Sequence, residues 1–320
     1  MTQTLDAVSS QRAFRPHTSY RHEAVFYRGH EEYMASIVPF IQEAVRGDQG
    51  CMVAVPGERL RLLQDAFERH TTGVHFVDMT VLGRNPARVI GVWQQFVEQH
   101  PGPVRGVVEP VWAGRRPEEI VECQLHEALM NLAIDPDTPL WLRCPYDLDA
   151  LSTQIIDGAH RSHPVLVDGD DIIGSRSYGG VTYANETFST DLPAPKGRQH
   201  ELEFFTSDIH RVRSAVLRFA DQAGVATDRA GDLATAMHEA ATNSTAYGGG
   251  SGTLRIWRES GALVCEIRDA GQIAEPLVGR RTQTPSGSTG RRLWMVEQLC
   301  DLTQIRSTAD QTIVRVFTWL

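Results

Sequence analysis

The sequence predicts two domains of different class, a parallel-sheet α/β domain followed by an α+β sandwich. The chain has 320 residues, and a typical domain holds about 100–200. Between residues 22 and 162, short apolar runs alternate with helical stretches, which predicts a parallel sheet covered on both faces. After residue 200, several strands alternate apolar and polar residues, as in an antiparallel sheet with one covered face.

The first domain is expected over residues 21–164, after a disordered N-terminus at 1–20. Its expected strands are 24–27, 51–55, 74–77, 104–108 and 140–144, and its expected helices are 31–46, 58–69, 86–99, 117–133 and 147–160. In the first helix, an apolar stripe recurs with a period of about 3.6 residues. That stripe comprises Tyr33, Ile37, Phe40, Ile41 and Ala44.

Residues 165–200 show no sustained period and contain Gly-Asp-Asp, Tyr-Gly-Gly and Pro-Ala-Pro-Lys-Gly, which predicts a linker. The second domain is expected over 201–320, with helices on one face of its sheet. Its expected strands are 201–206, 253–257, 263–268 and 312–320, and its expected helices are 209–223, 229–247 and 291–301.

Composition excludes several classes of protein. Lys196 is the only lysine beside 30 arginines, and no Gly-Lys-Ser/Thr occurs, which argues against Walker-A NTPases, eukaryotic-type kinases and Schiff-base enzymes. The net charge of −9 argues against nucleic-acid binding. The sequence has no 18-residue apolar run and no apolar stretch near its start, so we expect neither a membrane span nor a signal peptide. Five cysteines, an odd number lying mostly in apolar runs, predict reduced thiols and a cytoplasmic protein.

Three motifs in the second half can together hold a nucleotide. Glu239 and Asn243 lie four residues apart, so they share one helix face and can hold Mg²⁺. Asp269 ends a strand, where its carboxylate can accept the exocyclic amine of adenine, and Gly271 lets the backbone approach the base. The segment 285–294 is rich in Gly and Ser and leads into a helix, a junction that can surround phosphates with N–H groups. Each motif alone is common in ordinary helices and turns.

In this order and spacing, the motifs resemble the Bergerat (GHKL) ATP-binding fold. Glu239-Ala-Ala-Thr-Asn243-Ser and Leu293-Trp-Met-Val-Glu-Gln-Leu-Cys-Asp301 resemble its anti-sigma factor serine/threonine kinase branch. The resemblance implies that Asn243 binds Mg²⁺, that Glu239 is the catalytic base and that Asp269 reads adenine. It further implies an ATP-dependent kinase that sequesters a sigma factor and phosphorylates a serine on the antagonist protein. Members of that family often form dimers.

The second half departs from this family at its glycines. Asp-x-Gly-x-Gly becomes Asp269-Ala-Gly271-Gln-Ile273, and the phosphate loop's Gly-x-Gly becomes Gly290-Arg-Arg292. Gly287, Gly290 and Arg292 would then stand near the phosphates, where Arg292 either clashes with them or binds them through its planar fork. A pseudokinase that acts only as a binding switch is therefore an alternative to the serine kinase.

A sensor histidine kinase is a further alternative, because His126-Glu and His238-Glu imitate phosphoacceptor dipeptides. Autophosphorylation requires a helical hairpin before the ATPase, however, and residues 165–200 contain no heptads.

In the first half, we expect a ligand cleft beyond the carboxyl ends of the parallel strands. The tentative lining residues are Tyr27, Glu109, Trp112, Cys144 and Tyr146. They would suit a small, partly apolar molecule, although interface packing explains Trp112 and Tyr146 equally well. A second hypothesis is a metal site in which Cys123, His126 and Glu127 are completed by His22 or His163.

The first half resembles the methanogen/methylotroph sensory (MEDS) domain over about 20–163. The resemblance is carried by His22-Glu-Ala-Val-Phe-Tyr27, Val55-Pro-Gly, Glu109-Pro-Val-Trp, Glu122-Cys-Gln-Leu-His-Glu-Ala-Leu-Met-Asn131 and Cys144-Pro-Tyr-Asp147. It implies a sensory module with a RecA-like α/β fold that binds small hydrocarbon derivatives. The strand ending in Val55-Pro-Gly-Glu-Arg has no phosphate-loop lysine, so no second ATP site is expected.

Overall fold

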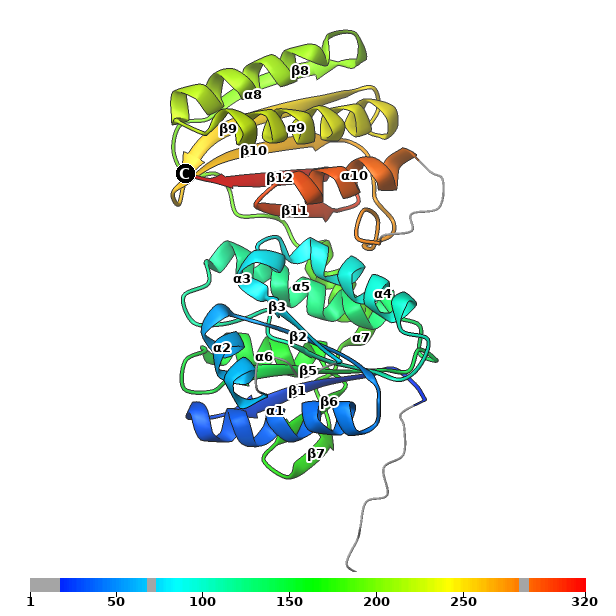
Figure 1. Cartoon of the computed structure of the whole chain (residues 1–320). Coiled ribbons are helices and arrows are strands. Elements are labelled where there is room, and N and C mark those ends of the chain that lie inside the picture. The colour runs from blue at the N-terminus through cyan, green and yellow to red at the C-terminus, as the bar shows by residue number, and fades with distance from the viewer. Residues whose placement is uncertain (1–17, 68–72, 282–287) are drawn as a thin grey trace, which may run out of the picture.

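The first lobe of the molecule is built on a seven-stranded sheet (Figure 1). The computed structural model describes residues 18–67, 73–281 and 288–320, so the expected disordered N-terminus lies almost wholly outside the described residues. The strand order is β3-β2-β4-β5-β1-β6-β7, parallel except for β7. The strands are β1 (Arg21–Tyr27), β2 (Gly50–Val55), β3 (Val74–Asp78), β4 (Val104–Val108), β5 (Leu140–Asp147), β6 (Val165–Asp168) and β7 (Asp171–Gly174).

Helices cover both faces of this sheet, as the lack of polar alternation in the strands predicts. They are α1 (Gly29–Arg46), α2 (Gly57–Ala66), α3 (Met79–Leu82), the 3-10 turn η1 (Pro86–Arg88), α4 (Val89–Gln99), α5 (Pro117–Ala133), α6 (Thr153–Ser162) and α7 (Gly180–Phe188). The expected stripe on α1 is confirmed, since Tyr33, Ile37 and Ile41 are fully buried. None of the described helices is both long enough and apolar enough to cross a membrane.

Residues 165–200 are more ordered than a linker. They contain the β6–β7 hairpin, which pairs with β1, and helix α7, which packs against α5. Their Gly- and Asp-rich composition marks the turn between two four-residue strands, where Gly169 has a φ of +56°. The longest stretch here without a helix or strand is 189–199, which leads into the second lobe.

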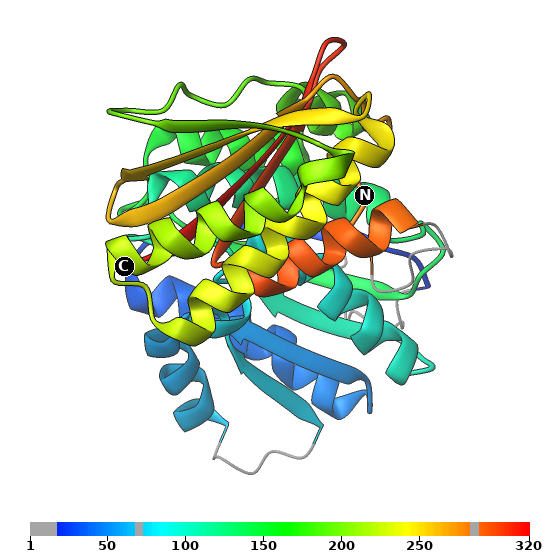
Figure 2. The same cartoon turned by 90° about the horizontal axis from the view of Figure 1, so that it is seen from above.

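The second lobe is an antiparallel five-stranded sheet of order β11-β12-β10-β9-β8. Its elements are β8 (His200–Phe205), η2 (Thr206–Asp208), α8 (His210–Ala223), α9 (Thr227–Tyr247), β9 (Ser251–Glu259), β10 (Ala262–Asp269), α10 (Ser288–Leu299), β11 (Leu302–Ser307) and β12 (Thr312–Trp319). Helices α8, α9 and α10 lie side by side over one face, as Figure 2 shows. The predicted α+β sandwich is confirmed.

Strand β11 is absent from the elements expected from the sequence. Its polar residues are as buried as its apolar ones, because this edge strand lies against the first lobe. Gln304 donates to the backbone carbonyl of Glu118, and Arg306 pairs with Glu122 of α5. The first lobe therefore covers an edge that would otherwise be open to pairing.

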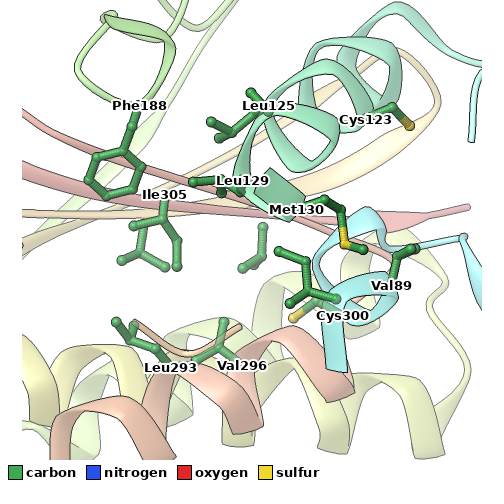
Figure 3. Close-up of a cluster of buried hydrophobic side chains, with 14 of the residues drawn as sticks. Val89, Cys123, Leu125, Leu129, Met130, Phe188, Leu293, Val296, Cys300 and Ile305 are labelled. Carbon is green, nitrogen blue, oxygen red and sulfur yellow. The ribbon is translucent and has the colours of Figure 1, made fainter. Parts of the chain in front are cut away.

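One apolar core runs from the first lobe into the second. Figure 3 shows side chains of α5 and α7 facing those of α10 and β11. Leu125, Leu129 and Phe188 come from the first side, and Leu293 and Ile305 from the second; each is at most 3 % exposed. Because apolar burial is the main favourable term in association, this shared core holds the two lobes in one arrangement.

Hydrogen bonds between the lobes also fix their relative position. Arg88 donates to the carbonyls of Glu297, Gln298 and Cys300 at the end of α10, at 3.1, 2.6 and 3.0 Å. A cation at the C-terminus of a helix satisfies carbonyls that have no partner within the helix. Nearby, Arg280 Nε donates to His126 Nε2 at 2.9 Å. The segment before α10 is therefore attached to α5.

Candidate functional site

Helix α9 brings Glu239 and Asn243 to one face, as their spacing predicts. Many residues of α9 are small, and its buried residues are mostly alanines, so the helix can pack closely against the sheet. Asn243 is 8 % exposed, and its side-chain oxygen Oδ1 has no hydrogen-bond partner among the described residues. A buried amide oxygen without a donor fits a ligand of Mg²⁺ or of an ordered water.

The end of β10 presents Asp269 beside that helix. Ser244 Oγ donates to one carboxylate oxygen of Asp269, and the backbone N–H of Gly271 donates to the other at 2.8 Å. A Cβ atom at Gly248 would lie 2.4 Å from the Asp269 carboxyl carbon, and one at Gly271 would lie 2.8 Å from its Oδ1. Both positions therefore require glycine, and the backbone closes around this carboxylate.

A pocket of about 320 Å³ opens at this point. Its lining includes three predicted site residues, namely Asn243, Asp269 and Gly271. The other lining residues are Tyr247, Gly248, Gln272, Ile273, Ala274, Glu275, Val278 and Thr312. A concave site with a few convergent polar groups suits a flat heteroaromatic ring. A larger hollow of about 530 Å³ lies between α8 and β9, away from these residues.

The missing second glycine leaves the pocket intact. Ile273 stands in its place, and its backbone N–H donates to Ser307 Oγ at 2.8 Å. Its side chain packs against the shared core. After Asp269, the turn is held by this hydrogen bond to Ser307 of β11, so it needs no second glycine.

The opposite end of the site, where the phosphates are expected, is shaped by α10. Gly290 is buried in the first turn of that helix, and Gly287 lies outside the described residues. Arg292 Nε lies 3.6 Å from Glu239 Oε2. Glu239, the expected base, is thus paired with the arginine that replaces a family glycine, and neither residue lines the 320 Å³ pocket.

The two histidines of the His-Glu dipeptides lie in different surroundings. His238 lies within α9 of the second lobe, and its Nδ1 is buried without a hydrogen-bond partner among the described residues. His126 is 3 % exposed and is bound between the carbonyl of Glu122 and Arg280. Burial and the adjacent Arg280 hold its pKa well below the usual value.

In the first lobe, Tyr27 and Glu109 meet at the carboxyl edge of the sheet. Arg59 of α2 joins them: its NH2 donates to Tyr27 Oη at 2.7 Å and to Asp147 at 3.1 Å, and its Nε lies 3.9 Å from Glu109 Oε1. Burial raises the pKa of Glu109 to about 8 despite the nearby Arg59. Arg59 and Asp147 were not among the expected residues, although Arg59 follows Val55-Pro-Gly at a strand-to-helix junction.

The other three expected lining residues lie elsewhere, so the five do not form one cleft. Side chains alternate across a sheet, and Cys144 and Tyr146 therefore point into the shared core, while Tyr27 points to the opposite face with Tyr33. Trp112 stacks on Arg115, whose guanidinium carbon lies 4.3 Å from the ring centroid. Trp112 and Tyr146 thus fit the packing explanation.

Comparisons with known proteins agree with this division of the chain. Residues 21–164 match the family model described as MEDS, the methanogen/methylotroph, DcmR sensory domain, and residues 205–318 match the histidine kinase-like ATPase domain. No curated protein matches the chain.

Two solved structures resemble parts of the chain. The SiaB-SiaC complex from Pseudomonas aeruginosa is 13% identical, with a TM-score of 0.29, and the match covers 37% of this chain and 88% of that one. The Acinetobacter baumannii histidine kinase AdeS is 14% identical, with a TM-score of 0.24, and covers 39% and 69% respectively. The family matches, together with the two sheets, show that the chain joins an N-terminal MEDS sensory domain to a C-terminal histidine kinase-like ATPase domain.

Proposed function

We propose that the protein is a cytosolic regulator whose second domain binds ATP with Mg²⁺ and sequesters a sigma factor. In the kinase form of this proposal, it also phosphorylates a serine on the antagonist protein. The observation that carries the nucleotide part is the 320 Å³ pocket, in which Asp269 and the unpartnered Asn243 Oδ1 converge. The five cysteines are buried free thiols, which fits a reducing compartment.

The residues of the pocket have separate roles in this proposal. Asp269 would accept the exocyclic amine of adenine, because its carboxylate is held by Ser244 and by the N–H of Gly271. Asn243 would contribute its amide oxygen to Mg²⁺. When bound, Mg²⁺ would offset the negative charge of the phosphates. Glu239, one helical turn from Asn243, would take the proton of the attacking serine hydroxyl.

The ion pair between Arg292 and Glu239 favours a second candidate function. A guanidinium that holds the carboxylate of the expected base competes with the contact between that carboxylate and a serine hydroxyl. The domain would then bind nucleotide and partner without transferring phosphate. In that form it is a binding switch rather than a kinase.

Two measurements separate these forms. Calorimetry with ATP and Mg²⁺ on the full chain should detect binding, and an absence of heat at millimolar nucleotide would refute the nucleotide part. Incubation with γ-labelled ATP and the anti-sigma antagonist proteins of the source genome should label a serine if the protein is a kinase. Complex formation without label would instead support the switch, and an acid-labile label on the protein itself would indicate a histidine kinase.

We further propose that a small-molecule signal in the first domain biases the second. Helix α5 provides the physical connection, because His126 and Glu122 contact Arg280 and Arg306 of the second domain. A ligand that moved α5 would thus move the chain segment between the nucleotide pocket and α10. Such coupling requires that the ligand bind two arrangements of the domains with different affinity.

A further inference from the structure

Four buried side chains with metal-binding atoms meet inside the first domain. His22 comes from β1, Cys144 from the adjacent β5, Glu127 from α5, and His163 follows α6. One ligand atom from each residue lies within 4.8 Å of all the others. All four residues are at most 2 % exposed.

The distances between these atoms suit a tetrahedral ion. His22 Nε2 lies 3.3 Å from Cys144 Sγ and 3.4 Å from Glu127 Oε2, and His163 Nε2 lies 2.8 Å from Glu127 Oε2. Ligands of a tetrahedral zinc ion lie about 3.3–3.6 Å from one another when each is about 2.0–2.3 Å from the metal. Of these three distances, only that between His163 and Glu127 falls below this range, and a small outward shift of either side chain would correct it.

Both imidazoles are oriented for metal binding. His163 Nδ1 lies 2.9 Å from the carbonyl of Ala159, which can only accept, so Nδ1 carries a hydrogen. Asn131 donates through Nδ2 to the carbonyl of Ser162, so its Oδ1 faces His22 Nδ1 and accepts from it at 3.0 Å. With a hydrogen on each Nδ1, the Nε2 atoms of His22 and His163 are left to face the centre, the arrangement in which histidine binds a metal.

Two atoms at the centre of the cluster lack an aligned hydrogen-bond partner. Glu127 Oε2 and His163 Nε2 are buried and have no well-aligned hydrogen-bond partner among the described residues, although they lie 2.8 Å apart. Two atoms that both present lone pairs repel each other unless a cation lies between them. Buried polar groups without a partner require such an explanation.

We propose that His22, Glu127, Cys144 and His163 form a closed binding site for a divalent transition metal of the zinc class. A thiolate, a carboxylate and two neutral imidazoles balance the charge of a dication, and the sulfur ligand disfavours Mg²⁺ and Ca²⁺. Four protein ligands leave no open position, which makes the site structural rather than catalytic. The metal joins β1, β5, α5 and the end of α6.

This site differs from the metal hypothesis drawn from the sequence. Glu127 is shared between them, and both proposed partners, His22 and His163, take part. Cys123 does not, because its Sγ donates to the carbonyl of Pro110 at 3.2 Å. His126 does not, because its Nε2 accepts from Arg280 in the domain interface. Residues 126 and 127 point to different sides of α5, and Cys144, which lies on a strand, completes the set.

Cobalt substitution tests the proposal on the full-length protein. We expect about one equivalent of Zn²⁺ per chain by elemental analysis after purification with zinc in the medium. After exchange, Co²⁺ should give the absorption of a tetrahedral site together with a sulfur-to-cobalt charge-transfer band. A wild-type protein that retains neither metal, or whose Co²⁺ spectrum lacks the sulfur band, overturns the proposal.

Matched variants identify the ligands. Cys144→Ser should abolish the sulfur-to-cobalt band, and His163→Gln should weaken metal binding at least about tenfold. Cys123→Ser, a buried cysteine one turn from Glu127 on the same helix, should leave both unchanged. An unchanged band in Cys144→Ser, or its loss in Cys123→Ser, would contradict the assignment. Because the wild-type spectrum is itself decisive, the test does not depend on the folding of any variant.

Discussion

Arg292 Nε lies 3.6 Å from Glu239 Oε2, so the arginine in place of a family glycine is paired with the residue expected to be the catalytic base. Arg292 neither lines the 320 Å³ pocket nor is fully exposed. The sequence left open whether this arginine clashes with phosphates or binds them. The structure shows a different contact, which restrains Glu239 instead.

Replacing Arg292 should increase phosphate transfer if the protein is a kinase. Arg292→Ala removes the contact that holds Glu239 and leaves its carboxylate available to the serine hydroxyl, so we expect at least about a tenfold faster labelling of the antagonist, since a positioned base contributes roughly 10²–10⁴-fold. Arg291→Ala, which removes the exposed neighbouring arginine, is the matched control and should have no effect. Slower labelling in Arg292→Ala would mean that Arg292 holds the phosphates.

Replacing Asp269 should weaken nucleotide binding. In Asp269→Asn, one carboxylate oxygen becomes an NH2 donor, so the Ser244 hydroxyl, the Gly271 N–H and the adenine amine compete for one neutral acceptor oxygen. Hydrogen bonds to charged groups contribute about 1.5–3 kcal/mol, so calorimetry should show ATP binding roughly 10–100-fold weaker. Asp310→Asn, in the exposed turn before β12, should bind ATP like the wild type. Equal affinity for all three proteins would place the nucleotide elsewhere.

Breaking the buried ion pair between Arg306 and Glu122 should destabilise the whole chain. These side chains are 2 % and 0 % exposed, and removing one partner from such a pair costs about 3–5 kcal/mol. We expect Arg306→Met to lower the urea midpoint clearly and Arg306→Met/Glu122→Gln to recover part of the loss. Arg28→Met, which breaks an exposed pair with Asp149, should cost about 0–1 kcal/mol. Equal losses for the two single variants would show that the interface pair is not buried in solution.

Glu109 should make the protein less stable as the pH rises. Burial raises the pKa of Glu109 to about 8, and the unfolded value is about 4.3. Between these values the folded state binds more protons, so the free energy of unfolding falls with increasing pH, by at most about 1.4 kcal/mol per pH unit. Glu109→Gln removes this contribution and should gain stability relative to the wild type between pH 5 and 8. Parallel urea midpoints for the two proteins across this range would contradict it.

The sequence predicted helices and strands well where apolar residues recur with the period of a helix or form the continuous run of a buried strand. The predicted helix at 117–133 coincides with α5 and the predicted strand at 104–108 with β4, because a proline stands at or just before the start of each. The helix expected from 147 begins instead at Thr153, since β5 continues to Asp147, whose Oδ1 accepts from the N–H of Asp149 in a turn. Strand β11 was missed because its polar residues find their partners on the first lobe.

The sequence by itself determined the two domain classes, the pairing of Asn243 with Glu239 on one helix face and the position of Asp269 at a strand end. These features depend only on residues a few positions apart, and the repeat of a helix or a strand sets how such residues lie relative to one another. Only the tertiary structure decided which distant side chains meet. His22 and Cys144 are 122 positions apart, and His126 and Arg280 are 154 apart. Such contacts depend on strand order, on the face to which each side chain points and on how the two lobes pack, and no local period records them.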